Sequence, residues 1–540
     1  MEKEEIPKLK MVSENKKYLF ILLAILILSF SLKLYYAQKY ATYTDEVLSS
    51  ITAEGIAHTG TPRLPSGAFY HRNPLFHYIL AIPVGLFGID YLSMRIPSIL
   101  FSLLTILAIF MFGVRIANKR VALAAAFLIS FSAPINQIAL SGRMYMVYTF
   151  FFTLTLYFFY RGFIESHSLS KKLCLISMAV SLLSFEGGAI IWPILLFLLF
   201  LYHKFRGARD PMVILGCLIW ILLTYFVLFY KIPGSYDPFT VRSDLFPGNF
   251  ISIHYSPRKF FRILTLSWRN LDAYIPFSIP FFLGMTIFLA KRKELKRHFP
   301  LLALISFLVI LPLFNFREQN RLVMTLVPLY VLTICQLLSS LLQWINFRQL
   351  SKNLQTKLLY PKSKLFLIIS AVIILLLAGI ISYKHIPVFS RHISSYVEAF
   401  GYIDSRYNPQ LTYDFIKKHA SEKDIIIQTT LDYGYFFLGE SQNHYYLRQR
   451  VTLDKLGNLY FTTFEQGKDP YYGRPIIDSK SKLLELIQSS SNKIWVVLGP
   501  KTKQMVDPEV KKFIEDNFDL VFDDWKRNRS QLYSTKVSSS

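Results

Sequence analysis

Apolar runs recur along the first 383 residues of the chain, separated by short loops. A helix of about 20 apolar residues crosses the hydrocarbon core of a bilayer, so most of these runs predict membrane spans. The composition agrees, because 53% of the 540 residues are hydrophobic and only 18% are charged. So few charged residues cannot cover the surfaces of several soluble domains. The pattern therefore excludes a wholly soluble protein and a disordered chain.

The runs predict eleven membrane spans, several of them short. We place these spans at residues 18–37, 95–115, 121–139, 146–163, 172–185, 188–202, 212–230, 276–290, 299–314, 322–343 and 365–383. Residues 74–88 are also apolar, but this segment is short and contains Pro83. We predict that it forms a helix lying at the membrane interface rather than a span.

The distribution of basic residues predicts the orientation. The net charge is +25, and Lys and Arg are concentrated in alternate loops. Cytoplasmic loops carry an excess of Lys and Arg, which places the N-terminus in the cytoplasm and residues 38–94 outside. The chain contains no nucleic-acid module, so we exclude nucleic acid as a partner and take the bilayer as the reason for the charge.

Residues 384–540 have a different character. Strands are predicted at 424–430, 493–498 and 520–522, and helices at 481–489 and 509–517. We therefore predict two domains: a polytopic α-helical membrane domain over residues 1–383 and an extracytoplasmic α/β domain over residues 384–540. The three cysteines lie inside apolar runs, so no disulfide is expected.

The predicted outer loops hold the candidate site residues. Asp45 and Glu46 follow the first span directly, and two adjacent carboxylates at a membrane exit are costly unless they are solvated or paired. A carboxylate in this place can act as a general base towards a hydroxyl or an amine. Glu186 lies in a tight turn on the same side, where we expect it to be solvated.

Basic residues at this outer boundary form a second group of candidates. Arginine is disfavoured there, and its guanidinium matches the oxygens of a lipid phosphate. The candidates for binding a lipid phosphate or donor are Arg143, Arg321, Arg317, Arg72, Tyr145 and His71. The long basic and aromatic loop at 231–275 is a candidate lid over the same site.

These features together resemble a known family. The pair Asp45-Glu46 after a first span, an Asn-Pro-Leu stretch at 73–75, Leu-Phe-Gly at 86–88 and Met-Arg-Ile-Pro-Ser at 94–98 are similar to the membrane glycosyltransferases of the GT-C fold. The most similar groups are the dolichyl-phosphate-mannose protein mannosyltransferases and the bacterial lipid A aminoarabinose transferases. The resemblance covers roughly residues 18–345. The chain departs from the family's usual Lys-Pro-Pro-Leu, since it has Arg72-Asn73 at that place.

The resemblance implies a glycosyltransferase that uses a polyprenyl-phosphate sugar of the dolichyl or undecaprenyl type. Asp45 would be the base, and Glu46 would orient it or hold a divalent metal. Arg143 and Arg321 would neutralise the lipid phosphate. A single displacement at the sugar carbon would invert its configuration, and no covalent intermediate or redox cofactor is needed. A protein hydroxyl, a glycolipid or a cell-surface glycan could be the acceptor of the hexose or pentose.

Two alternatives remain open. Residues 431–435, Leu-Asp-Tyr-Gly-Tyr, resemble part of the Trp-Trp-Asp-Tyr-Gly motif of oligosaccharyltransferases, although we interpret residues 432–434 as a turn after a strand. A membrane transporter or lipid flippase would show inverted repeats and polar residues near the middle of its spans. The polar residues of this chain instead collect on one side of the membrane.

Overall fold

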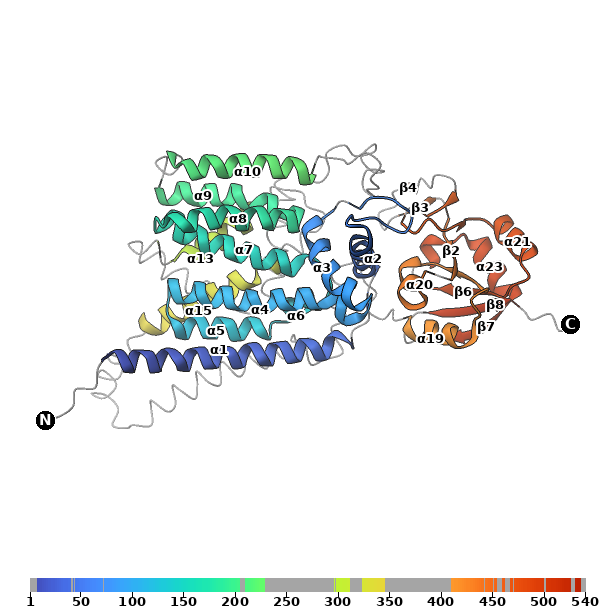
Figure 1. Ribbon diagram of the computed structural model, residues 1–540, viewed down its shortest axis with the longest axis horizontal. Helices are drawn as coiled ribbons and strands as arrows, with labels where there is room; N and C mark the ends of the chain where they lie inside the picture. The colour runs from blue at the N-terminus through green and yellow to red at the C-terminus, as the bar shows by residue number, and fades with distance from the viewer. Residues whose placement is uncertain are drawn as a thin grey trace, which may run out of the picture.

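The computed structural model shows a helical bundle and a mixed α/β unit that follow one another along the longest axis of the molecule (Figure 1). The described residues are 7–39, 42, 44–70, 72–203, 209–228, 296, 298–310, 323–344, 409–440, 442–449, 451–453, 459–461, 467–469, 471–499, 502–525 and 530–535. The spans predicted at 276–290 and 365–383, the candidate lid at 231–275 and the predicted domain boundary at 384 lie outside them.

Long apolar helices run side by side through the bundle. They are α1 (Pro7–Ala37), α4 (Tyr91–Ile116), α5 (Lys119–Ser130), α7 (Tyr145–Phe159), α8 (Ser168–Ser184), α9 (Ile191–His203), α10 (Pro211–Leu228), α13 (Phe299–Ile310) and α15 (Val327–Trp344). Within the described residues, four helical stretches are long and apolar enough to cross a membrane: Lys16–Ala37, Tyr91–Ile116, Tyr145–Ile164 and Glu186–His203. The predicted count of eleven spans is therefore not confirmed.

One predicted span differs in the structure. Residues 121–139 form two helices, α5 and the short α6 (Ala133–Ala139). Pro134, in the first turn of α6, has no N–H to donate to the carbonyl of Ser130 four residues earlier, so α5 cannot continue unbroken through this point.

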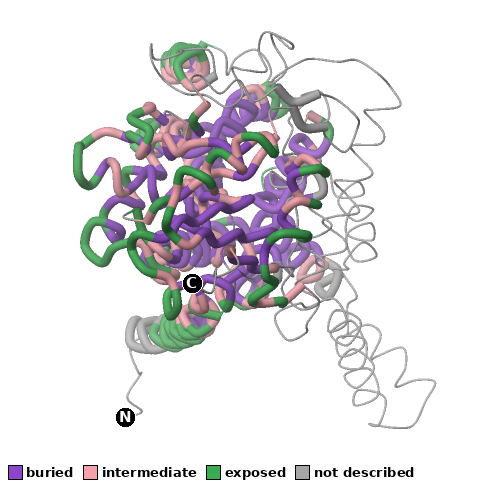
Figure 2. Tube along the Cα trace, turned by 90° about the vertical axis from the view of Figure 1, so that its right-hand side faces the viewer, coloured by how far each residue is buried: buried purple, intermediate pink, exposed green. Residues whose placement is uncertain are grey.

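The core of the bundle is apolar, and its outer helices expose apolar side chains. Figure 2 shows buried residues throughout the interior, whereas α1, next to the N-terminus, is largely exposed. Leu19, Phe20 and Leu28 of α1 are exposed by 65%, 73% and 59%. Such a surface is unfavourable in water and suits the lipid phase. Cys174 and Cys335 are buried, Cys217 is partly buried, and each of the three carries a free thiol.

Two short helices lie at the end of the bundle that faces the α/β unit (Figure 1). They are α2 (Thr44–Thr59) and α3 (Pro74–Phe87), and they pack against each other. Helix α3 begins at Pro74, whose fixed φ suits a first helical position. Asn73, just before it, has the left-handed φ of 49° that asparagine tolerates better than most residues. The helix predicted at 74–88 is confirmed by α3.

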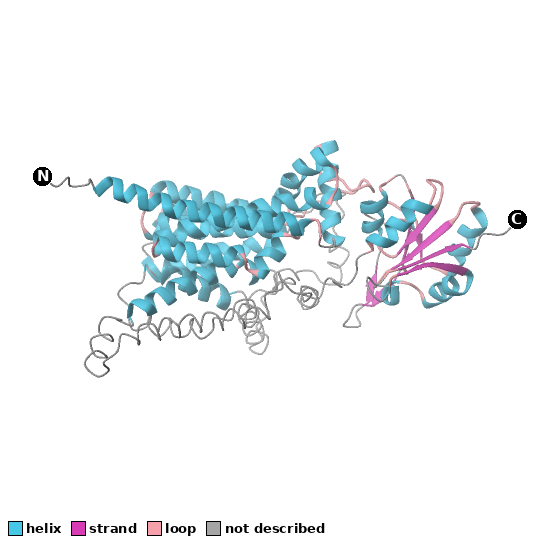
Figure 3. Ribbon diagram, turned by 90° about the horizontal axis from the view of Figure 1, so that it is seen from below, coloured by secondary structure: helices cyan, strands magenta, loops and turns pink. Residues whose placement is uncertain are grey.

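The C-terminal unit is built on a six-stranded sheet with helices on both faces (Figure 3). Its strand order is β5 (Ile476–Ile477), β2 (Asn443–Leu447), β1 (Ile425–Gln428), β6 (Ile494–Leu498), β8 (Gln531–Thr535) and β7 (Phe518–Asp523). The first four strands are parallel, and the last two are antiparallel to their neighbours. A separate ribbon pairs β3 (Val451–Leu453) with β4 (Leu459–Phe461). Strands β1 and β6 are buried along their whole length, which explains their continuous apolar sequences.

Four helices cover this sheet. One face is covered by α21 (Lys480–Ser489) and α23 (Pro508–Asn517), the other by α19 (Gln410–His419) and α20 (Leu431–Leu438). The short α22 (Thr502–Met505) follows β6. The strands and helices predicted between 424 and 522 are thus confirmed.

The interpretation of residues 432–434 as a turn is wrong, because they lie inside α20. Gly434 fits this helix because a Cβ there would lie 2.0 Å from the side-chain nitrogen of Gln428. The glycine therefore marks close packing of α20 on β1 rather than a turn.

Candidate active site

The acidic pair lies in the first turn of α2, and its two members have opposite environments. The Asp45 side chain is 39% exposed, whereas the Glu46 side chain is fully buried. Successive residues of a helix point about 100° apart, so neighbours in sequence face different surroundings. Here one carboxylate is turned into the bundle and the other to its rim.

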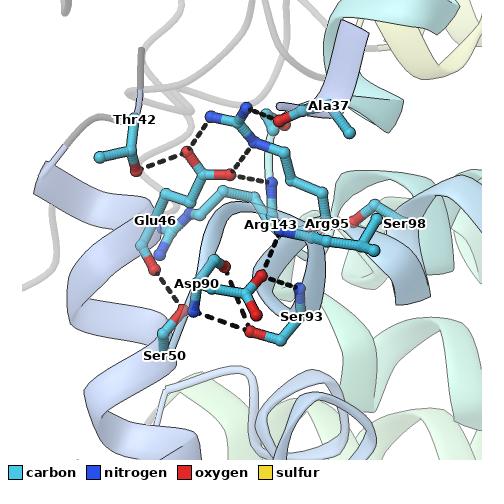
Figure 4. A network of polar contacts seen from close by, with 12 residues as sticks. Ala37, Thr42, Glu46, Ser50, Asp90, Ser93, Arg95, Ser98 and Arg143 are labelled. Atoms are coloured by element: carbon cyan, nitrogen blue, oxygen red, sulfur yellow. Dashed lines mark hydrogen bonds and ion pairs between the residues drawn. The ribbon is translucent and has the colours of Figure 1, made fainter. Parts of the chain in front are cut away.

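Glu46 is held by four donors (Figure 4). Arg95 donates from Nε and Nη2 to the two carboxylate oxygens, at 2.7 and 2.9 Å. The hydroxyl of Thr42 donates to Oε2 at 2.8 Å, and the N–H of Gly142 donates to Oε1 at 2.9 Å. Such a two-pronged, fully hydrogen-bonded pair offsets much of the cost of burying both charges.

Arg95 reaches Glu46 because of how α4 begins. Asp90 caps the helix by accepting the N–H groups of Leu92 and Ser93, and the Ser93 hydroxyl accepts the N–H of Asp90. This capping box fixes the first turn of α4, and Arg95 is the residue directly after that turn. The Nη1 of Arg95 also donates to the carbonyl of Ala37 at 2.5 Å, which ties the end of α1 to the same cluster.

Gly142 has no room for a side chain. A Cβ at this position would lie 2.5 Å from the carbonyl oxygen of Met94 and 2.9 Å from Oε1 of Glu46. The loop before α7 can therefore approach Glu46 with its backbone only because residue 142 is glycine.

Asp45 meets Arg143 at the rim. The Nη2 of Arg143 lies 3.7 Å from Oδ2 of Asp45, and Nη1 donates to the Asp45 carbonyl at 2.9 Å and to the Ser49 hydroxyl at 2.6 Å. The hydroxyl of Ser98 holds the backbone of Arg143 at 3.1 Å. Residues that are 98 positions apart in the chain thus converge, and the Asp45 carboxylate keeps a solvent-facing side.

The segment before α3 forms a second wall near Asp45. Arg72 forms an ion pair with Glu186, whose side chain is only 11% exposed. Glu186 is therefore paired and largely buried rather than solvated, because the turn at 186 packs inside the bundle. Burial raises the pKa of Tyr70, and the positive charges of Arg72 and Arg143 oppose this rise.

Two buried side chains in this wall lack hydrogen-bond partners among the described residues. They are Asn73, through Oδ1, and His77, through both ring nitrogens. His77 packs edge-on against Tyr70, with ring centres 5.4 Å apart. Burial, aided by the positive charge of Arg143 and opposed by a contact with the Arg72 backbone that falls short of good hydrogen-bond geometry, lowers the pKa of His77 to about 3, so its imidazole is neutral near pH 7.

The remaining predicted site residues are distributed as follows. Tyr145 is buried in the core, with its ring 5.4 Å from that of Phe185. His71, Arg317 and Arg321 lie outside the described residues. The structure therefore brings together Asp45, Glu46 and Arg143, and it gives no position for Arg321.

A metal site is not evident in the described part of the chain, where no three His, Cys, Asp or Glu side chains cluster. The oxygens of Glu46 already accept four hydrogen bonds, two of them from a cation. A metal would have to displace the Arg95 guanidinium, so these oxygens do not fit the metal role that the family resemblance implied for Glu46.

Comparison with solved structures identifies the fold. ArnT from Cupriavidus metallidurans in its apo state matches with a TM-score of 0.57 and 14% identity, over 97% of this chain and 98% of that one. The same protein bound to undecaprenyl phosphate gives the same values. The oligosaccharyltransferase AglB from Archaeoglobus fulgidus, in complex with an inhibitory peptide and a dolichol-phosphate, matches with a TM-score of 0.52 and 16% identity, over 90% of this chain and 70% of that one.

The chain has the GT-C fold of membrane glycosyltransferases. In sequence, residues 71–230 match the family model of dolichyl-phosphate-mannose-protein mannosyltransferase. A search of curated proteins finds no significant match. The GT-C fold and the apolar helices together make this a multi-pass membrane protein.

Within this GT-C fold, sequence reasoning missed two residues that hold the site. Arg95 was part of a family stretch, but its own signal was a lone charge within an otherwise apolar run. Gly142 was not predicted as a site residue, since a glycine in a loop does not by itself reveal a close backbone approach. Both residues act on Glu46 and therefore on the start of α2.

Proposed function

We propose that the protein transfers a sugar from a polyprenyl-phosphate donor to an acceptor at the outer face of the membrane, with Asp45 as the general base. The observation that carries this proposal is the contrast within the acidic pair. Glu46 is fully engaged inside the protein, whereas Asp45 keeps an exposed carboxylate beside a guanidinium at the end of the bundle. Two neighbours of the same fold support the donor class, because ArnT binds undecaprenyl phosphate and AglB binds a dolichol-phosphate.

The chemistry requires one displacement. Asp45 takes the proton of the acceptor hydroxyl or amine while that atom bonds to the anomeric carbon. The bond from that carbon to the phosphate oxygen breaks on the opposite face, so the configuration inverts and polyprenyl phosphate leaves. Positive charge near the leaving phosphate oxygens stabilises this step. We assign this charge to Arg143, with Arg317, Arg321 and His71 as further candidates.

The other members of the predicted site receive different roles in this proposal. Arg72 holds the segment before α3, since Glu186 already compensates its charge. Glu46 and Tyr145 position the surrounding elements from within the core. The N-terminus is cytoplasmic, and the α/β unit lies outside the cell membrane with the site.

An assay with a labelled polyprenyl-phosphate sugar tests this function. Asp45→Asn removes the base and should lower transfer by about 100- to 10,000-fold. Because Asp45 is 39% exposed, the variant should still fold and keep its thermal unfolding temperature. Glu54→Gln makes the same chemical change on the same helix and should leave transfer unchanged. Full activity in Asp45→Asn would rule this carboxylate out as the base.

An oligosaccharyltransferase is a second candidate, favoured by the likeness to AglB. The chain covers nearly the whole length of ArnT but only 70% of AglB, which favours the first proposal. Donors that carry one sugar or an oligosaccharide, offered to the same preparation, distinguish the two. A transporter or flippase would move the labelled lipid across the bilayer without forming a glycosylated product.

A further inference from the structure

The α/β unit contacts the three segments that build the candidate active site. On α2, Val47 and Ile51 pack with Leu431, Tyr435 and Tyr472 in one buried cluster. At the start of α4, the ring of Tyr91 lies edge-on to that of Phe436, 5.1 Å away. In the loop before α3, the N–H of Ser66 donates to the Tyr471 carbonyl at 3.2 Å.

Most of these contacts come from α20, which follows the carboxyl end of β1, and the others come from Tyr471 and Tyr472, which precede β5. Helix α20 starts three residues after β1 ends at Gln428, and it packs directly on α2. In Figure 1, α2 lies between the bundle and the α/β unit. Helix α2 is thus fixed on two sides, with Glu46 and Ser50 buried towards the bundle and Val47 and Ile51 buried against the α/β unit.

A further hydrogen bond links the two units at Thr42, two residues before α2 begins. The hydroxyl of Tyr433, in α20, donates to the backbone carbonyl of Thr42 at 3.1 Å, and this contact is buried. The hydroxyl of the same Thr42 donates to Oε2 of Glu46 at 2.8 Å. Thr42 is therefore held by its backbone from the α/β unit and by its side chain from the Glu46–Arg95 pair.

We infer that the α/β unit is a structural part of the active site, and that Tyr433 is a positioning residue which fixes the first turn of α2, and with it Asp45, through Thr42. Asp45 lies three residues after Thr42, so a shift of Thr42 changes where its carboxylate points. A base must approach its proton within hydrogen-bonding reach, and a small misplacement slows the reaction. The inference rests on the proposed role of Asp45.

The test compares two tyrosine variants of the full-length protein. Tyr433→Phe removes only the hydroxyl that reaches Thr42. Tyr413→Phe is the matched control, because its buried hydroxyl donates at 2.6 Å to Gln428 inside the same unit. We expect Tyr433→Phe to lower kcat about threefold to tenfold, as the loss of one hydrogen bond implies, while the KM for the donor stays within about twofold. Tyr413→Phe should leave both constants unchanged.

Hydrogen exchange supplies a readout that needs no activity. In Tyr433→Phe, the backbone amides of the first two turns of α2 should exchange faster than in the wild type, and in Tyr413→Phe they should not. Thr42→Val removes the other arm, and its effect on kcat should be less than multiplicative with that of Tyr433→Phe, since both act through Thr42.

The outcomes are separable. Equal exchange in α2 and equal kcat for the two tyrosine variants would overturn the inference. If the wild type transfers no sugar from any donor, the proposed function fails, while the exchange experiment still decides whether Tyr433 holds α2. Faster exchange with unchanged kcat would show that Tyr433 holds the helix without positioning the base, which also overturns the inference.

Discussion

Two regions at the same end of the bundle treat buried polar atoms in opposite ways. Around Glu46, both carboxylate oxygens have donors from three different segments of the chain. Around His77, the ring nitrogens and the Asn73 side-chain oxygen are buried and make no well-formed hydrogen bond among the described residues, although the Arg72 backbone lies near the imidazole. A satisfied network holds geometry, whereas an unsatisfied buried group costs stability. The geometry of the site is therefore held by the pairing of Glu46 on α2 with Arg95 on α4, and not by the segment at 70–77.

The largest loss of stability is expected when the hydrogen-bond network around Glu46 is disrupted. Arg95→Met leaves the Glu46 carboxylate buried without its counter-charge and should cost about 3–5 kcal/mol of stability. The matched control is Arg115→Met, because Arg115 pairs with Glu165 but its side chain is 50% exposed. That variant should cost less than about 1 kcal/mol. Thermal unfolding in detergent measures both, and equal losses would contradict the distinction.

A smaller effect is expected when a side chain is forced against Glu46. Gly142→Ala places a methyl group 2.5 Å from the Met94 carbonyl oxygen, so the loop must shift away. We expect a loss of about 1–3 kcal/mol, as in other overpacked sites. Gly85→Ala in α3 is the control, since its Cβ meets only the Ala57 methyl at 3.0 Å. A Gly142→Ala protein as stable as wild type would show that the approach is looser than described.

The smallest change in stability is expected at His77. His77→Phe removes two unpartnered nitrogens at similar volume and should change stability by about 1 kcal/mol at most, in the stabilising direction. The low pKa of His77, about 3 against an ordinary 6.5, also predicts how the stability of the protein depends on pH. Between pH 6.5 and pH 3, His77 binds a proton in the unfolded chain but not in the folded protein. The folded state therefore keeps its full stability above pH 6.5 and loses stability as the pH falls towards 3.

The measurement is the unfolding temperature of both proteins between pH 7 and pH 4. The wild type should lose more stability than His77→Phe over this range. Parallel curves for the two proteins would mean that His77 has a partner in solution, such as a bound water, and that the two regions differ less than proposed.

Much of the fold could be predicted because its signals are local. Apolar runs predicted the membrane helices, and local sequence patterns predicted the strands β1, β6 and β7 and the amphipathic helices α21 and α23. Residues 432–434 were misread because a glycine after a strand usually indicates a turn. Here Gly434 permits a helix to pack on Gln428, a neighbour that lies across the interface of α20 and β1.

The sequence by itself determined that the chain is a membrane protein with an α/β unit, because the length and period of apolar segments suffice for that. It also pointed to Asp45 and Glu46, since two adjacent carboxylates at a membrane exit are costly unless they are solvated or paired. Only the tertiary structure decided which acid is buried and which is exposed. That choice depends on Arg95, Gly142 and Arg143, which reach α2 from 49 to 98 residues away. Pairing energies between such distant residues arise only once the helices have packed, and no local pattern records them.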